Sequence, residues 1–249
     1  MHLILEITSH FVSAWKRESE NLTLLENLEF VSKTESGYKE TLSQLIEKLG
    51  DLNRFDVFSC SYFGQAFSVV PSSLFAASTP EALLQFTVQR TLTKSDVEYN
   101  RLPEWNAVII YELPMWVKSV LILKAPRIVI QHEMTHLLRH LTTGSMVPLR
   151  SHVVIHEDQF SLVIRKDGAI VHTSIQEYQN EADVVYHVAN AFTQLNISTK
   201  NELFIHGTVA KSESKCATIV AQMKRMNLFE QTKFEIQPTH HLQFQKLCV

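Results

Sequence analysis

Two stretches of the chain follow the same plan, and they decide its fold. Residues 2–25 read HLILEITSHFVSAWKRESENLTLL, and residues 152–172 read HVVIHEDQFSLVIRKDGAIVH. Each contains a short apolar strand, a tight polar turn, an alternating strand, another turn and a third strand. A polar spacer, an amphipathic helix and a further strand follow in both places. Because solenoid repeats have shorter periods, the pattern predicts two similar lobes.

Size and composition exclude several classes of protein. The chain has 249 residues, of which 45% are hydrophobic, which is enough for two cores. The net charge is −3 and basic residues do not cluster, so we expect no nucleic-acid partner. The sequence shows no secretory signal and no apolar run of about 20 residues, so we expect no membrane insertion. Three widely spaced cysteines suit reduced thiols, and we expect a cytoplasmic protein.

The first lobe continues with alternating helix and strand patterns. Apolar residues at helical spacing predict a helix over Tyr38–Leu49, which Gly50 ends as a C-cap. The other elements predicted in this lobe are a strand at Phe55–Cys60, a strand at Phe67–Val70, a helix beginning at Thr79–Pro80, a strand at Trp105–Tyr111, a helix at Pro114–Leu123, a strand at Arg127–Ile130 and a helix at Glu133–Leu141. The stretch from Gly144 to Pro148 then predicts a domain boundary, with domains at 1–149 and 150–249.

The second lobe has the clearer pattern. Asp167-Gly168 is a hairpin signal, and the elements after the three strands are a helix at Glu181–Leu195, a strand at Glu202–His206, a helix at Ser212–Met226 and a strand at Leu228–Ile236. The order β-β-β-α-β-α-β predicts an α/β lobe with a mixed sheet, because hairpins pair strands antiparallel and helical crossovers pair them parallel. The first lobe has the same order, with extra elements expected around 55–80 and 113–141.

This arrangement resembles the duplicated, ribonuclease H-like fold of actin, the sugar kinases and the heat-shock ATPases. Within that fold, several segments resemble an uncharacterised bacterial family, domain-of-unknown-function family 3822: Val70–Phe75, Phe160–Gly168, Glu181–Tyr186 and Leu203–Gly207. The resemblance covers nearly the whole chain. It implies a two-lobed actin-like ATPase fold and no assigned activity.

The resemblance also implies a place for nucleotide. In working members, the first turn of each lobe binds phosphate through backbone N–H groups and carries an Asp and a Gly. Here the predicted turns are Glu6–Ser9 and His156–Gln159, neither of which contains glycine, and the later Gly-Gly is reduced to Gly207-Thr208. We therefore expect degenerate turns and no resident cofactor. Glu6, Asp158 and Gly207 are the candidate residues for the alternative, a cleft that binds ATP with Mg²⁺.

The segment Gln131–Leu138 contains the pattern His-Glu-x-x-His. His132 and His136 would share one helix face and could hold Zn²⁺, while Glu133 would polarise the bound water. No third histidine follows at the spacing of the extended motif. The nearest carboxylate for a third ligand, Glu157, falls in a predicted hairpin turn. The other interpretation places His132 and Glu133 at a strand-to-helix junction, with Glu133 favourable to the helix dipole.

These patterns favour a non-catalytic interaction or adaptor module with a protein partner. The precedent is an analogy, since bacterial proteins of this superfamily serve as cytoplasmic adaptors in secretion and pilus machines, and a fold does not establish a function. One alternative is a weakly nucleotide-binding, ATPase-like protein that uses Glu6 and Asp158. The other is a zinc-dependent hydrolase that uses His132, Glu133 and His136. The sequence does not predict the oligomeric state.

Overall fold

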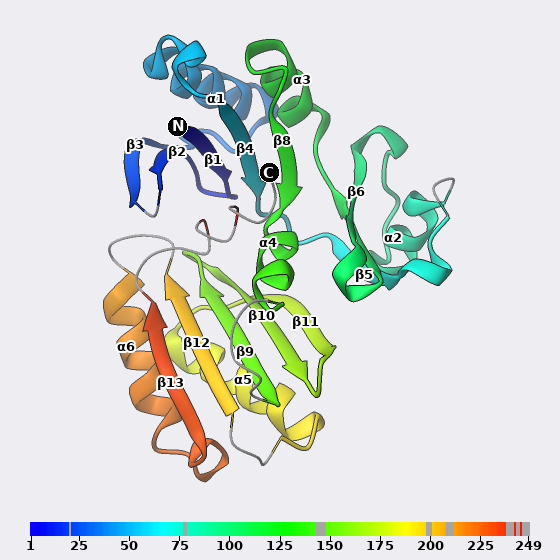
Figure 1. Cartoon of the computed structure of the whole chain (residues 1–249), viewed down its shortest axis with the longest axis vertical. Helices are drawn as coiled ribbons and strands as arrows, with labels where there is room; N and C mark the ends of the chain where they lie inside the picture. Colours follow the sequence, from blue (N-terminus) through cyan, green and yellow to red (C-terminus); the bar gives the residue numbers. More distant parts are fainter. Residues whose placement is uncertain are drawn as a thin grey trace. The chain divides into compact units, whose positions relative to one another are not determined.

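The computed structural model describes residues 1–19, 21–76, 79–142, 148–197, 201–207, 212–237, 242 and 245 (Figure 1). The chain divides into two compact units, one formed by Met1–His136 with Gln245–Val249 and the other by Leu137–Phe244. This division falls inside helix α4 (Glu133–His140). The sequence placed a domain boundary at residue 149, in a stretch whose Gly144 lies outside the described residues, and that boundary stays a prediction.

The first unit is built on a five-stranded sheet of order β3-β2-β1-β4-β8. Its strands are β1 (His2–Ile7), β2 (Phe11–Glu18), β3 (Asn21–Glu29), β4 (Val57–Tyr62) and β8 (Val129–His132). The first three strands pair antiparallel, whereas β1, β4 and β8 run parallel. Helix α1 (Glu35–Leu49) connects β3 to β4, and α3 (Met115–Lys124) precedes β8.

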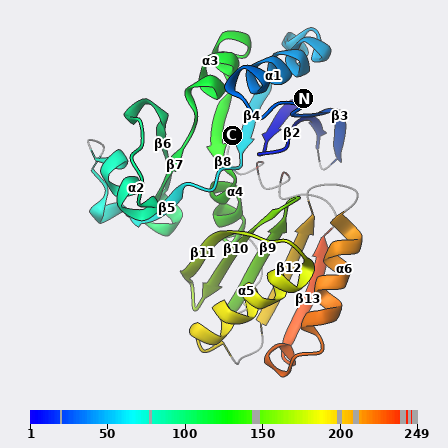
Figure 2. The ribbon, with the colours of Figure 1, turned by 180° about the vertical axis from the view of Figure 1, so that it is seen from behind.

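The second unit repeats this topology with its own sheet, of order β11-β10-β9-β12-β13. Its strands are β9 (Leu149–Ile155), β10 (Gln159–Lys166), β11 (Ala169–Glu177), β12 (Asn201–Gly207) and β13 (Thr232–Gln237). As in the first sheet, the first three strands, β9, β10 and β11, pair antiparallel, whereas β9, β12 and β13 run parallel. Helices α5 (Glu181–Gln194) and α6 (Ser212–Met223) cover one face of this sheet (Figure 2). The predicted β-β-β-α-β-α-β order is therefore confirmed.

A third, smaller sheet is inserted in the first unit between β4 and α3. It has the order β5-β7-β6, all antiparallel, from β5 (Phe67–Pro71), β6 (Val97–Leu102) and β7 (Ala107–Glu112). Helix α2 (Pro80–Val88) packs on it around a small core of Leu84, Leu92, Val108 and Ile110. The insertion thus spans 67–112 rather than the predicted 55–80 and 113–141, because β4 and β8 are strands of the main sheet and α3 is the helix before β8.

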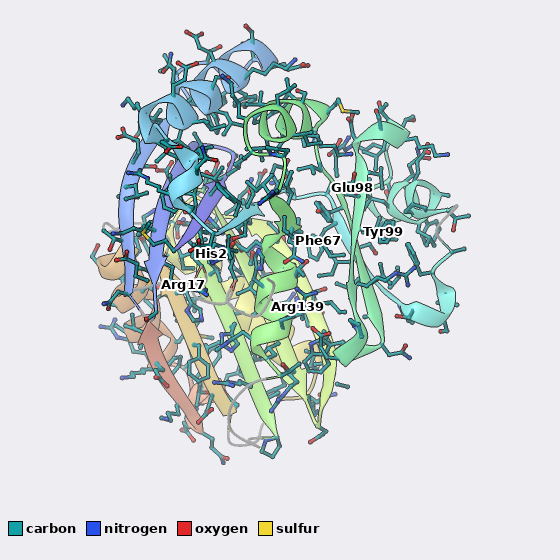
Figure 3. The ribbon with its side chains drawn as sticks, turned by 45° about the horizontal axis from the view of Figure 1, so that its top comes forward. His2, Arg17, Phe67, Glu98, Tyr99 and Arg139 are labelled. Atoms are coloured by element: carbon teal, nitrogen blue, oxygen red, sulfur yellow. The ribbon has the colours of Figure 1, made fainter. Side chains whose placement is uncertain are left out.

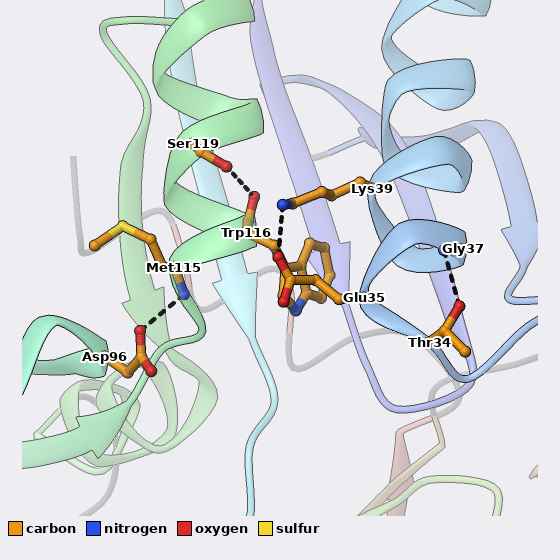
Figure 4. Close-up of polar contacts among 8 residues, drawn as sticks. All are labelled: Thr34, Glu35, Gly37, Lys39, Asp96, Met115, Trp116 and Ser119. Carbon is orange, nitrogen blue, oxygen red and sulfur yellow. Dashed lines mark hydrogen bonds and ion pairs between the residues drawn. The ribbon is translucent and has the colours of Figure 1, made fainter. Parts of the chain in front are cut away.

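Local signals fix several element ends where the sequence predicts them. The side chain of Thr34 accepts a hydrogen bond from the Gly37 N–H (3.3 Å) and caps α1 (Figure 4). Gly50 ends that helix at φ 68°, a conformation that costs little only for glycine. Asp167 and Gly168 both have positive φ, as the predicted two-residue hairpin requires.

Four strands begin two to four residues later than the sequence predicts, β4 and β7 among them. The last strand of the first sheet is β8 at Val129–His132, shifted toward the C-terminus from the expected Arg127–Ile130. It is an edge strand, so Val129 keeps 39% of its surface exposed instead of being buried. In the second unit a 3₁₀ turn at Asn227–Phe229 occupies the start of the expected strand, and β13 begins at Thr232.

Helices α1 and α3 pack through aromatic rings. Tyr38 of α1 stacks on Trp116 of α3 with a ring-centroid distance of 5.3 Å, and Phe30 meets Tyr38 edge-on at 4.7 Å. The carboxylate of Asp96 accepts from the Met115 N–H (3.1 Å) at the start of α3 (Figure 4). Since α3 begins after a proline and has no capping side chain of its own, this contact satisfies one of its first N–H groups.

Candidate functional site

A row of buried polar side chains crosses the first sheet. Strand register places Ser13, Glu6, Ser61 and Gln131 beside one another on β2, β1, β4 and β8. All four are at least nine-tenths buried. Ser13 Oγ donates to Glu6 Oε2 (2.9 Å), and Trp15 Nε1 donates to Ser13 Oγ (2.7 Å). The carboxylate of Glu6 is therefore held inside the sheet by its cross-strand neighbour.

This position corrects the predicted first turn. The sequence places Glu6 in a turn over Glu6–Ser9, but β1–β2 pairing continues to Ile7 opposite Val12. The turn is formed by residues 8–10 instead. Because apolar Ile7 extends the strand by one more pair, Glu6 lies within β1, on the same face as Ser13 and Ser61.

Three backbone N–H groups at this first turn already donate hydrogen bonds within it. The Thr8 N–H donates to Phe11 O (3.0 Å), and the N–H groups of His10 and Phe11 donate to Thr8 Oγ1 (3.2 and 3.0 Å). Thr8 Oγ1 in turn donates to Phe11 O (3.1 Å). A phosphate would have to break these bonds before it could use the same donors. Thr8 therefore closes the turn that would cradle phosphate in a nucleotide-binding protein of this fold.

The second turn, after β9, is held by two side chains from elsewhere in its unit. Tyr178 Oη donates to His156 O (2.6 Å), and Lys215 Nζ donates to Glu157 O (3.3 Å) and to Tyr178 Oη (3.1 Å). The backbone carbonyl of Asp158 accepts from the Tyr178 N–H (2.9 Å). Burial raises the pKa of the Tyr178 hydroxyl, which keeps it a donor at neutral pH.

Sequence reasoning did not find Tyr178 or Lys215, because neither stands in a motif or near the turn along the chain. Of the predicted nucleotide residues, Gly207 ends β12 and pairs in register with Ile155, the residue before the second turn. Gly207 and Asp158 thus lie at the same end of the second sheet. Glu6 belongs to the first unit, and Thr208 lies outside the described residues.

The His-Glu-x-x-His segment lies at a strand-to-helix junction. His132 ends β8 and Glu133 begins α4. His132 Nδ1 accepts from the Met134 N–H (3.1 Å), and its Nε2 donates to the carbonyl of Gly64 (2.8 Å). These partners fix the tautomer, and burial lowers the pKa of His132 to about 4. The ring is a neutral core group with both nitrogens occupied.

Within the first unit, His132, Glu133 and His136 do not form the zinc site of the hydrolase alternative. His136 and Glu133 are buried in α4, and Glu157 lies in the turn of the second unit. Over the part of the chain that the structure describes, no three His, Cys, Asp or Glu side chains are grouped to hold a metal ion. A zinc ligand needs a free ring nitrogen, which His132 does not offer.

A histidine pair that the sequence did not single out lies in the second unit. His152 of β9 and His206 of β12 share one hydrogen bond, Nδ1 to Nε2 at 2.8 Å, and their rings stack nearly parallel. His152 also stacks on Phe204, its register partner, and meets His140 edge-on. Burial, and next the neighbouring His206, lower the pKa of His152 well below its usual value. His152 is therefore a neutral ring in a cross-strand contact with His206.

The comparisons with known proteins agree with this fold. The model of the family described as protein of unknown function DUF3822 matches residues 2–223, and the chain belongs to that family. A search of curated protein sequences finds no match. Among the helices of the described residues, none is long and apolar enough to cross a membrane.

Similar solved structures define the fold class as the actin-like ATPase fold. A Bacteroides thetaiotaomicron protein with that fold and unknown function has a TM-score of 0.79 and 18% identity, over 100% of this chain and 95% of its own. The PilM-PilN type IV pilus biogenesis complex includes a chain with a TM-score of 0.54 and 11% identity, over 94% of this chain and 90% of its own. The ethanolamine utilization protein EutJ from Carboxydothermus hydrogenoformans has a TM-score of 0.52 and 10% identity, over 98% of this chain and 87% of its own.

Proposed function

We propose that this protein is a non-catalytic interaction module with an actin-like ATPase fold, whose nucleotide-binding turns are degenerate and whose ligand is a protein. One observation carries the proposal. In the first turn the N–H groups of Thr8, His10 and Phe11 are all bonded within the turn itself. A phosphate site needs such donors to point outward, unbonded, at the ligand.

A further observation supports this interpretation. A similar structure is a complex between two proteins of pilus biogenesis, PilM and PilN, so the fold is compatible with a role in assembly.

The proposal also covers the evolutionary origin of the two sheets and the cellular location of the protein. We infer that the identical strand order of the two sheets reflects an internal duplication in a bacterial protein. Cys60 and Cys216 are buried and form no disulfide within the described part of the chain, which agrees with a reducing compartment such as the cytoplasm. The nucleotide-binding alternative would need the first turn to open, and no observation favours the zinc hydrolase.

A thermal unfolding experiment with Mg-ATP tests the proposal. A nucleotide at 100 times its Kd would stabilise the folded protein by about 2.7 kcal/mol, which for a chain of this size raises Tm by about 5–10 °C. We expect no shift at about 5 mM Mg-ATP, and no release of phosphate. A reproducible shift of several degrees would overturn the proposal in favour of the nucleotide-binding alternative.

The variant Thr8→Ala provides a matched comparison. It removes the hydroxyl that occupies the N–H groups of His10 and Phe11. Thr87→Ala is a suitable control, because Thr87 is an exposed threonine on α2 whose hydroxyl bonds Ser68 Oγ and Leu83 O, far along the chain from the first turn. If the closed turn is what prevents nucleotide binding, any increase in Tm on adding Mg-ATP occurs in Thr8→Ala and not in Thr87→Ala.

A further inference from the structure

A chain of buried polar groups in the first unit ends on a side chain from the far end of the sequence. His2 Nε2 of β1 lies 2.8 Å from Ser59 Oγ of β4, and Ser59 Oγ donates to Gln245 Oε1. His2, Ser59 and Gln245 are 6%, 1% and 0% exposed. Gln245 is 186 residues from Ser59 in the sequence, yet it belongs to the same compact unit.

The direction of the hydrogen bonds follows from the partners. Ser59 has one hydrogen, and it goes to the carbonyl oxygen of Gln245, so His2 Nε2 must donate to Ser59 Oγ. Burial, and next the Arg17 guanidinium, lower the pKa of His2 to about 4, so the ring is neutral. Arg17 is the register partner of His2 on β2 (Figure 3). Ser59 and His2 together form a preorganised donor for an amide carbonyl.

Gln245 uses only one of its two polar side-chain atoms in this contact. The Nε2 group of Gln245 is buried and has no hydrogen-bond partner among the described residues. Turning the amide over would let Nε2 donate to Ser59 but would leave Oε1 unpaired instead. A buried amide atom without a partner costs free energy compared with its hydrated state. Gln245 therefore bonds Ser59 through Oε1, but its unpaired Nε2 lowers the free energy needed to replace it with another carboxamide.

We propose that His2 and Ser59 form a binding site for the side-chain carboxamide of a segment of a protein partner, and that Gln245 is its intramolecular occupant. This inference rests on the proposed function and deepens it, because it locates a partner site on the first unit. A partner segment would present a glutamine or asparagine to Ser59 and bring an acceptor for the unpaired N–H groups. Gln245 holds the site when the partner is absent.

The covalent connection of Gln245 to the rest of the chain makes the proposal quantitative. A ligand joined to its site by a short linker has an effective concentration in the millimolar range. A free peptide must compete with that concentration in the wild-type chain but not in Gln245→Ala. With a peptide Kd of about 0.1 mM, the wild-type chain is expected to bind about tenfold more weakly than the variant.

Fluorescence anisotropy with a labelled peptide tests the expected difference in peptide affinity between the wild-type chain and Gln245→Ala. The probe has the sequence of residues 238–249 with Cys248→Ser, and the full chain is used as wild type and as Gln245→Ala. We expect about tenfold tighter binding to Gln245→Ala, and loss of that binding when Ser59→Ala is added. Ser68→Ala is the control, since Ser68 lies on β5 and bonds Thr87 at the surface. A peptide carrying Gln245→Ala should not bind.

A second measurement covers the case in which Gln245→Ala does not fold. A protease site replaces residues 238–241 in the otherwise wild-type chain, which is cut after folding. We expect the cut segment to exchange for labelled peptide, and the uncut chain not to do so. Equal binding to all chains, or no exchange after cutting, would overturn the proposal. A wild-type dimer that Gln245→Ala dissolves would overturn it too, since the occupant would then be a second copy. A response to Mg-ATP bears on the proposed function alone.

Discussion

The ring of His132 makes the stability of the first unit depend on pH. In the folded chain the ring is neutral, because Nε2 donates to Gly64 O, Nδ1 accepts from the Met134 N–H, and burial lowers its pKa to about 4. In the unfolded chain its pKa is near 6.5. Below that pH the unfolded chain binds a proton that the folded chain does not. The contribution of the ring to stability is therefore complete above pH 6.5 and is lost as the pH falls toward 4.

The magnitude follows from the two pKa values. At about 1.36 kcal/mol per pH unit, lowering the pH from about 7.5 to about 5 costs about 2 kcal/mol at this one site. His132→Gln keeps a donor for Gly64 O but cannot titrate. The variant loses stability at both pH values through its poorer fit. We expect the difference between its two unfolding free energies to be about 2 kcal/mol smaller than in the wild type.

Urea unfolding followed by tryptophan fluorescence measures this difference. Trp15, Trp105 and Trp116 all lie in the first unit, so the signal reports the unit that contains His132. The control is His172→Gln, because the His172 ring is half-buried on β11 of the second unit and should leave the fluorescence transition unchanged. If His132→Gln loses as much stability between the two pH values as the wild type, the ring is not a neutral buried group and the assignment of its tautomer is wrong.

Three further predictions concern local stability, each checked by urea unfolding. Thr8→Ala removes the hydroxyl that accepts from two turn N–H groups, and we expect a loss of about 1–2 kcal/mol in the first unit. Gly50→Ala places a side chain at φ 68°, and we expect a loss of about 1 kcal/mol; an unchanged midpoint would contradict the C-cap. Asn180→Ala breaks the capping box of α5 and should cost about 1 kcal/mol, whereas Asn190→Ala, on the exposed face of the same helix, should cost less than half of that.

Most of the strand order could be predicted because it depends on local patterns. Alternating apolar residues in 2–25 and 152–172 predict the two meanders, and both sheets contain them. Asp167-Gly168 and Gly50 act through their own backbone conformations, so their roles are readable without any partner. The strand at Val97–Leu102 was not predicted. Its sequence, VEYNRL, has weak alternation, and only pairing with β7 makes it a strand.

The candidate sites could be predicted less well because they depend on register. Glu6 reads as a turn residue until the pairing of Ile7 with Val12 places it within the sheet. The spacing of His132 and His136 suits a metal, but Gly64 and the N–H of Met134 occupy both ring nitrogens of His132. A short motif reports which side chains share a helix face. It does not report which backbone groups reach them from elsewhere.

The sequence by itself therefore determined that this chain forms two mixed α/β sheets of one topology, without glycine in the turns that would bind phosphate. Periodicity and turn chemistry act over a few residues, so they are visible in a linear pattern. Only the tertiary structure decided that Lys215 and Tyr178 hold the second turn, and that Gln245 reaches Ser59. The long-range contacts among these depend on how distant segments pair and pack, and that register is a property of the whole fold.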